Sequence, residues 1–301
     1  MRLTFGILMS LMVGVAHANA DLTAAIENVR TTCGNISNEL TNMKKIAGIT
    51  TAVTGVGTVT SGIALGTGLA KANVDKEIEA MEKLPSLTIE DEKKFKEAAL
   101  DYAKSISMSK YIDTNKDHAE QKSKTLGNIR TGTLASATAT NIAGAIMSST
   151  NQIKGNLKQQ IDECLSSVKT LSNIHMQARI SKTATDTDLA RAENIIRACD
   201  AWTTVDVSSI NNRSKGATVS SGIGAGLGLA GTITSASANS VNTDNTKNND
   251  PEKEKNLNTA ANLLAGGTTA ASLSATIFNA TQINAIKRAA TVAEECEGAL
   301  K

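Results

Sequence analysis

Four cysteines, Cys33, Cys164, Cys199 and Cys296, are the residues of this chain with the clearest chemistry. Thiols can form disulfides, bind soft metal ions or act as nucleophiles. No two of the four lie in a Cys-x-x-Cys spacing, so we expect no metal site. An even number of cysteines in an exported chain favours disulfides instead.

Little else in the sequence could catalyse a reaction or hold a cofactor. His118 and His175 are isolated, and His175 falls on the apolar stripe of a predicted helix. Residues 226–231 match Gly-x-Gly-x-x-Gly, but they lie in a helix-like run of small residues with no strand before them. The net charge of +2 gives no bulk attraction for nucleic acid or for an anionic membrane. We therefore expect no enzyme activity, no cofactor and no nucleic-acid partner.

The N-terminal residues have the pattern of a secretory signal. Arg2 supplies a positive charge, residues 3–15 form a short apolar run, and Ala18-Asn19-Ala20 is a small-x-small cleavage pattern. This predicts removal of residues 1–20 and a periplasmic or secreted protein of a bacterial envelope. An uncleaved anchor helix is the alternative interpretation, although the apolar run is shorter than the ~20 residues that span a bilayer.

The composition favours long helices over a thick globule. Aromatic residues make up 2% of the chain, and the two prolines are Pro85 and Pro251. Small side chains let helices approach closely, and long helices without proline are uninterrupted. The predicted fold is all-α, with two tandem antiparallel helical hairpins packed as an elongated four-helix bundle.

The two hairpins look like copies of one unit. Residues 24–33 and 190–199 share an alanine, a Glu-Asn pair and the final cysteine at a constant offset. Residues 162–164 and 294–296 are likewise similar around the second cysteine of each copy. Between its cysteines each copy has a Gly-rich uncharged stretch, a polar or charged break with one proline, and a second uncharged stretch. This order indicates an internal duplication.

The predicted organisation follows from this duplication. A signal peptide occupies 1–20, the first hairpin 21–185 and the second hairpin 186–301. The first hairpin carries a charged helical insert at 71–125, which is either a solvated cap or a partner-binding head. Residues 181–188 are polar and predict the turn between the copies.

Apolar residues spaced alternately by four and three predict helical seams that include all four cysteines. In the first copy these seams are Leu22, Ile26, Val29, Cys33, Ile36, Leu40, Met43 and Ala47, then Leu157, Ile161, Cys164, Val168, Leu171, His175 and Ala178. In the second copy they are Leu189, Ala192, Ile196, Cys199 and Thr203, then Ile286, Ala289, Ala293 and Cys296.

The distance of each cysteine from the fold-back point predicts the pairing. In both copies the two cysteines lie nearly equal numbers of residues from the charged break, so they should meet at one level of the hairpin. A disulfide requires Cα atoms within ~7 Å, which facing seam positions can provide. We predict the pairs Cys33–Cys164 and Cys199–Cys296. The alternatives are Cys33–Cys199 with Cys164–Cys296, or buried free thiols.

Four uncharged stretches, at 46–70, 131–153, 216–241 and 257–286, are rich in Gly, Thr, Ala and Ser. Glycine costs about 1 kcal/mol per helix-interior position relative to alanine. Yet an apolar stripe at helical spacing runs through the first stretch, and it comprises Ile49, Val53, Val56, Thr60, Ile63, Thr67 and Ala70. Some environment must therefore stabilise these helices.

Three environments remain open. The first is close packing of small residues in a soluble bundle. The second is a bilayer, where Gly62-x-x-x-Gly66 and Gly222-x-x-x-Gly226 match the small-xxx-small packing motif. The third is β-structure built on the alternation of Val, Thr and Gly.

These observations predict an exported structural or interaction protein of the envelope, a helical scaffold or spacer without catalysis. The alternative is a membrane-inserting or pore-forming protein that uses its small-residue hairpins. The expected partners are an unidentified protein or a second copy, with membrane contact through 46–70 and 216–241.

Overall fold

The computed structural model describes residues 21–82, 98–241 and 251–301. Within these ranges the chain is helical apart from short connections, and no residue there is in a strand. The all-α prediction is confirmed, and β-structure for the four uncharged stretches is wrong. The predicted signal peptide and residues 83–97 of the charged insert lie outside the described residues.

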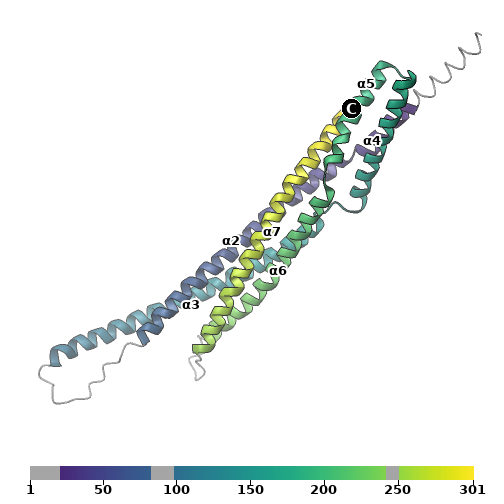
Figure 1. The fold of residues 1–301 in the computed structure, drawn as a ribbon. Coiled ribbons are helices and arrows are strands. Elements are labelled where there is room, and N and C mark those ends of the chain that lie inside the picture. The colour runs from purple at the N-terminus through teal and green to yellow at the C-terminus, as the bar shows by residue number, and fades with distance from the viewer. Residues whose placement is uncertain (1–20, 83–97, 242–250) are drawn as a thin grey trace, which may run out of the picture. The chain divides into compact units, whose positions relative to one another are not determined.

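Figure 1 shows the helices in chain order. A first helical segment covers residues 21–33. The elements that follow are α2 (Ile36–Glu82), α3 (Ala98–Thr150), α4 (Gly155–Ser181), α5 (Asp186–Asp200), the short 3₁₀ helix η2 (Ala201–Thr204), α6 (Val207–Val241) and α7 (Pro251–Leu300).

The four long helices α2, α3, α6 and α7 form a bundle in which sequence neighbours are antiparallel. Side-chain hydrogen bonds join α2 to α3 and to α7, and they join α3 to α6. The bonds are Ser123 Oγ to Asp75 Oδ1 (2.6 Å) between α3 and α2, Thr58 with Thr276 (3.0 Å) between α2 and α7, and Thr131 with Ser235 (2.8 Å) between α3 and α6.

Helices α3 and α7 run parallel and keep one register. The amide of Asn141 donates to Ser272 Oγ (2.8 Å), and Ser148 Oγ donates to Asn279 Oδ1 (3.2 Å). Gln282 donates to the carbonyl of Asn151. All three pairs are separated by 131 residues. The chain from α3 to Asn151 therefore meets α7 at a constant register.

The described chain divides into two compact units. The disulfide unit holds the described residues up to Thr51 together with Ile146–Thr218 and Ile277–Lys301. The polar-core unit holds the described residues of Ala52–Ala145 and Val219–Thr276. Each long helix contributes to both units, so the division does not follow the boundary between the two hairpins.

The turn predicted at 181–188 separates α4 from α5. Lys182 follows α4 in the left-handed conformation (φ 49°), and its N–H reaches the carbonyl of Ala178. Thr185 caps α5, because its hydroxyl oxygen accepts from the backbone N–H of Asp188 (3.2 Å). This prediction is confirmed.

A second helix start depends on Asp206, immediately before α6. Its Oδ1 accepts from the backbone N–H of Ser209 (2.9 Å) and from the hydroxyl of Ser208 (2.7 Å). These bonds favour the carboxylate, so they hold the pKa of Asp206 below its ordinary value. The cap is therefore complete at neutral pH and weakens as the pH falls through that lowered pKa.

The core of the disulfide unit follows the predicted apolar seams. Apart from half-buried Met43 and His175, every seam residue of the first copy is buried, and so are Ile286, Ala289, Ala293 and Cys296. The α5 seam differs from the prediction. Ile195 and Trp202 are buried there, whereas Ile196 is half-buried and Thr203 is exposed. The chain leaves α5 through the tighter η2 turn, which brings Trp202 inward.

The polar-core unit has the same heptad rhythm with a different content. The buried positions of its part of α2 are Thr54, Gly57, Ser61, Ala64, Gly68, Lys71 and Val74. The apolar stripe beside them faces outward, since Val56 is 52% and Ile63 is 46% exposed. Its one buried apolar cluster consists of Ala64, Leu134 and Ala265. Small and polar side chains therefore fill this core.

The glycines that pack helices together are not those that the small-xxx-small motif indicated. A Cβ added at Gly62, Gly66, Gly222 or Gly226 would meet nothing within 4 Å. One added at Gly228 would lie 2.5 Å from Thr138 Oγ1. The glycines whose added Cβ would lie closer than 3.0 Å to another helix are Gly57, Gly68, Gly127, Gly144, Gly224, Gly228 and Gly267. The predicted motifs instead point away from the bundle.

Two alanine substitutions on α6 should therefore have opposite effects on stability. Gly226→Ala should raise the free energy of unfolding by up to about 1 kcal/mol, because alanine has the higher helix propensity and space is free. Gly228→Ala has the same propensity gain but collides with Thr138, so it should be destabilising. Thermal unfolding followed by circular dichroism compares the two. Equal shifts would contradict the assigned packing face.

Candidate functional site

Two disulfides join helices at the core of the disulfide unit. Cys33 is bonded to Cys164 (S–S 2.06 Å, Cα–Cα 4.9 Å), and Cys199 is bonded to Cys296 (S–S 1.96 Å, Cα–Cα 4.5 Å). These are the pairs that the level argument predicted. All four side chains are at most 2% exposed. The bridges close loops of 131 and 97 residues, so each one joins segments that are distant in the chain.

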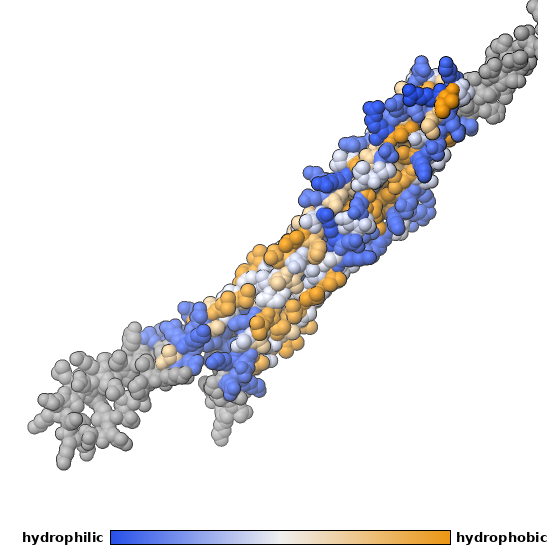
Figure 2. Space-filling view, in the orientation of Figure 1, coloured by the Kyte–Doolittle hydropathy of each residue, from blue (hydrophilic) through white to orange (hydrophobic). Residues whose placement is uncertain are grey.

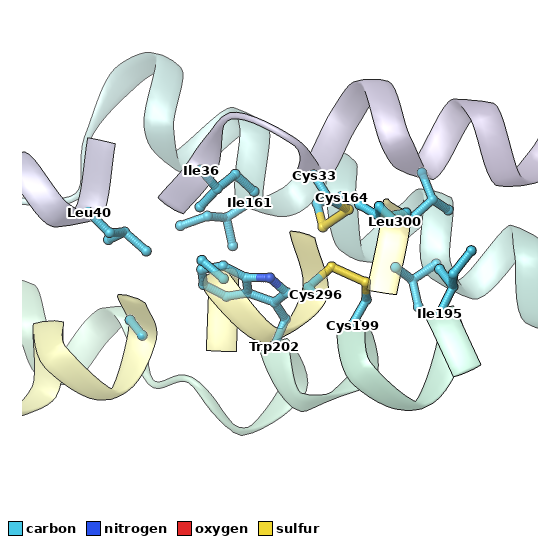
Figure 3. Packing of buried hydrophobic residues seen from close by; sticks show 14 of the residues in the cluster. Cys33, Ile36, Leu40, Ile161, Cys164, Ile195, Cys199, Trp202, Cys296 and Leu300 are labelled. Atoms are coloured by element: carbon cyan, nitrogen blue, oxygen red, sulfur yellow. A yellow bond between two sulfur atoms is a disulfide. The ribbon is translucent and has the colours of Figure 1, made fainter. Parts of the chain in front are cut away.

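The two bridges lie in one layer (Figure 3). The sulfurs of Cys33, Cys164 and Cys296 are all within 4.8 Å of one another. Trp202 lies beside the Cys199–Cys296 bridge with its ring 1% exposed. Each of the four sulfurs is already bonded to another sulfur, and the described chain holds no free cysteine. The layer is therefore a covalent clamp in this oxidised form.

The polar-core unit contains a fully buried arginine, Arg130 of α3. Its guanidinium donates to Ser235 Oγ (2.8 Å), Asn258 Oδ1 (2.8 Å) and Asn262 Oδ1 (3.1 Å). Arg130 and Ser235 are 0% exposed. A buried cation is costly unless its donors are satisfied, and here one residue of α6 and two of α7 satisfy them. Arg130 therefore joins three helices at one level.

A second buried cation, Lys71 of α2, lies near this level. Its Nζ contacts Asp75 Oδ2 (2.8 Å) and Glu254 Oε1 (3.2 Å), and the Lys71 side chain is 2% exposed. Asp75 also accepts from Ser123 Oγ. The carboxylates remain partly exposed, at 31% and 21%. The charges are thus compensated inside the chain.

Along the uncharged stretches the outer surface of the polar-core unit is largely apolar. Figure 2 shows hydrophobic side chains gathered on the visible face of the long helices. The exposed large apolar residues of this unit are Val56, Val59, Ile63, Leu69, Ile129, Ile142, Val219, Ile223, Leu229, Ile233, Leu263 and Leu273. Soluble monomers rarely expose a contiguous apolar surface of this kind.

Several hydroxyls on that surface donate to carbonyls of their own helices. Thr60, Thr67, Thr133 and Thr234 each donate to the carbonyl four residues earlier, at 2.8–3.0 Å. Exposed Ser274 donates to Ala270 in the same way (2.9 Å). A hydroxyl bonded to its own backbone can leave water at little cost. The Thr-rich composition is therefore compatible with an apolar surrounding.

The other residues that the sequence suggested are not brought into a site. His118 is exposed on α3, and His175 is half-buried on α4. Residues 226–231 lie within α6 and form no loop. Sequence reasoning missed the cluster around Arg130 and Lys71, although these two cations border the uncharged stretches. The heptad position of Lys71 could have indicated its burial, because Lys71 lies three positions after buried Gly68.

No protein-family model matches this chain, and the searches of curated proteins and of solved structures return no match either. The class of protein is therefore described from the fold and the site alone. The chain is an all-helical, twice disulfide-bonded protein. One of its units has an apolar core, and the other has a polar core and an apolar surface.

Proposed function

We propose that this chain is an exported envelope protein whose polar-core unit inserts into a lipid bilayer while its disulfide unit remains in water. The observation that carries the proposal is the reversed burial pattern of the polar-core unit. Thr54, Ser61 and Asn141 are 0% exposed, whereas Val59 is 62% exposed. Hydrocarbon makes such an arrangement favourable, because apolar side chains face lipid and polar ones bond to each other.

The length of the uncharged stretches supports insertion. The stretch 46–70 has no charge, and a helix of that length extends over ~37 Å, against ~30 Å for the hydrocarbon core. Among the described residues one helical run, Asp21–Ala80, is long and apolar enough to cross a membrane by length and composition, and 28% of its most apolar part is buried. A core helix passing the same test would be mostly buried.

The disulfide unit supports export and a role in water. Leu40, Ile161 and Ile195 lie in an apolar core at most 2% exposed, as in soluble bundles. Its two bridges suit an oxidising compartment, in agreement with the secretory pattern of residues 1–20. Such a protein would anchor, span or permeabilise an envelope membrane. A soluble scaffold whose apolar face is covered by a second copy is the competing function.

Lysine substitutions on the outer face separate these functions. Ile63→Lys with Leu229→Lys places two charges at exposed positions, which costs a soluble monomer little. Each lysine at a bilayer centre costs about 2.5–3.5 kcal/mol, so flotation of the purified protein with liposomes should be largely lost. Ile180→Lys is the control, because Ile180 is 78% exposed on the disulfide unit.

Circular dichroism should show all of these variants to be equally helical. If the unmodified protein stays at the bottom of the gradient, or if the double variant floats as well as the control, insertion is excluded. A wild-type dimer that the double variant converts to monomer in detergent-free buffer would favour the scaffold.

A further inference from the structure

Six exposed cations of the disulfide unit border the uncharged stretches. Lys44 and Lys45 immediately precede 46–70 on α2, and Lys154 follows 131–153. Lys215 precedes 216–241 on α6. Lys287 and Arg288 follow 257–286 on α7. These six residues are called the cation collar below. Every uncharged stretch thus has an exposed basic residue at the end that belongs to the disulfide unit.

Contacts within the disulfide unit place the helices of the collar at one level. The backbone N–H of Ile153 donates to Asn211 Oδ1 (2.8 Å), and Arg213 Nη1 donates to the carbonyl of Thr281 (2.7 Å). These bonds tie the residue before Lys154 to α6, and α6 to α7.

The chain around Asn151 completes the level. Gln282 donates to the Asn151 carbonyl. In the amide orientation that satisfies both of its polar atoms, the Asn151 side chain donates to the carbonyl of Met43 (3.3 Å). Its amide oxygen accepts from the backbone N–H of Ala47 (3.0 Å). Lys44 and Lys45 lie between those two residues of α2. The collar residues on α2, α6 and α7 and the one that follows α3 therefore lie within a few helical turns of one another.

No acid of the described chain neutralises the collar through an ion pair. The cations Arg30, Lys71 and Arg197 do form ion pairs with acids of the described chain. The acids nearest in sequence, Glu39, Asp162, Asp206 and Glu294, lie at least five positions away from any collar residue. At the other end of the stretches 46–70 and 257–286 acids and bases alternate, as in Asp75-Lys76-Glu77 and Glu252-Lys253-Glu254-Lys255.

We infer that the cation collar binds the headgroups of anionic phospholipids on the face of the bilayer beside the disulfide unit. The inference rests on the proposed insertion and names its lipid class. Lysine and arginine at the end of a bilayer-spanning helix reach the interface while their aliphatic stems stay near hydrocarbon. Exposed cations without acidic partners keep their full attraction for lipid phosphate. At the opposite end of the stretches in α2 and α7 acids balance the bases, so those ends give no comparable preference.

Flotation with two kinds of vesicle tests the inference. One kind is phosphatidylcholine alone, and in the other part of it is replaced by phosphatidylglycerol. At low salt the full chain should partition roughly tenfold or more in favour of the phosphatidylglycerol vesicles. High salt should reduce that preference, because exposed charges are screened.

Two matched double variants locate the effect. Lys44→Gln with Lys45→Gln should lose about tenfold of the preference for phosphatidylglycerol while still floating with phosphatidylcholine. Lys122→Gln with Lys124→Gln, exposed on α3 beyond the other end of its stretch, should retain it. Equal behaviour of the two variants would overturn the collar.

The outcomes also separate the collar from insertion. Equal flotation of the unmodified chain with both vesicles would leave insertion standing and remove the collar. Flotation with phosphatidylglycerol that high salt reverses completely would keep the collar and remove insertion. A chain that floats with neither vesicle would refute both.

Discussion

Replacing Cys33 and Cys164 by serine should lower the free energy of unfolding by roughly 2–5 kcal/mol. The bridge closes a loop of 131 residues, so its loss releases a large conformational entropy in the unfolded chain, although the mechanism is model-dependent. The new hydroxyls would also replace buried sulfurs in a core where Cys33 and Cys164 are at most 2% exposed. Both terms act in the same direction.

Urea unfolding followed by tryptophan fluorescence measures this change. Trp202 is the one tryptophan of the chain, and it lies beside the other bridge, so its signal reports on this core. The Cys199→Ser, Cys296→Ser variant is the matched comparison and should be similarly destabilised, because its loop spans 97 residues. A loss below about 0.5 kcal/mol in both would mean that the bridges are not structural.

Peptide mapping without reduction must accompany the unfolding data. The sulfur of Cys296 lies within 4.8 Å of those of Cys33 and Cys164, so bridges between the two hairpins are within reach of a small movement. Mapping that finds Cys164 bonded to Cys296 would contradict the pairing described above. Free thiols in oxidised material would contradict the clamp altogether.

Arg130→Ala should be the most destabilising single substitution in the polar-core unit, at about 3–5 kcal/mol. It removes three donors from Ser235, Asn258 and Asn262 and leaves a cavity where a fully buried side chain was. Buried acceptors without donors cost 1–3 kcal/mol each, and the helices that Arg130 joins could close the gap only in part.

Two controls make the measurement specific. Arg130→Lys keeps the charge but cannot bond three acceptors in the same planar geometry, so it should recover part of the loss. Lys122→Ala removes an exposed cation from the same helix and should change stability by less than about 0.5 kcal/mol. Thermal unfolding in a mild detergent, read by circular dichroism, compares them. An Arg130→Ala variant as stable as Lys122→Ala would refute the assigned role.

The disulfide unit could be predicted well from sequence because one physical rule decided its core. Apolar residues repeat there at heptad spacing, as in Leu22, Ile26, Val29 and Cys33, with mostly polar residues between them. For a helix in water, this pattern leaves one face that favours burial. The bridges followed from counting residues along antiparallel arms. The failure in α5 arose because the 3₁₀ turn after Asp200 moved Trp202, and not Thr203, to the inner face.

The polar-core unit could not be predicted in the same way, because two stripes compete on each helix. In α2 the apolar stripe through Ile49 and Val56 and the small, polar stripe through Thr50 and Gly57 have the same period and differ by one position. Periodicity therefore gives the helix but not its inner face. Only the partners across the bundle, such as Thr140 and Asn141 against Gly57, decide it.

Both covalent links are confined to the disulfide unit, and this has a consequence for any rearrangement of the rest. The four long helices could separate laterally in the polar-core unit and replace contacts with each other by contacts with lipid. Their ends would remain joined through the disulfide unit. Re-association would then be an intramolecular reaction at high effective concentration, independent of the amount of protein present. A chain joined in this way can open and close repeatedly, and the same helices pair again each time.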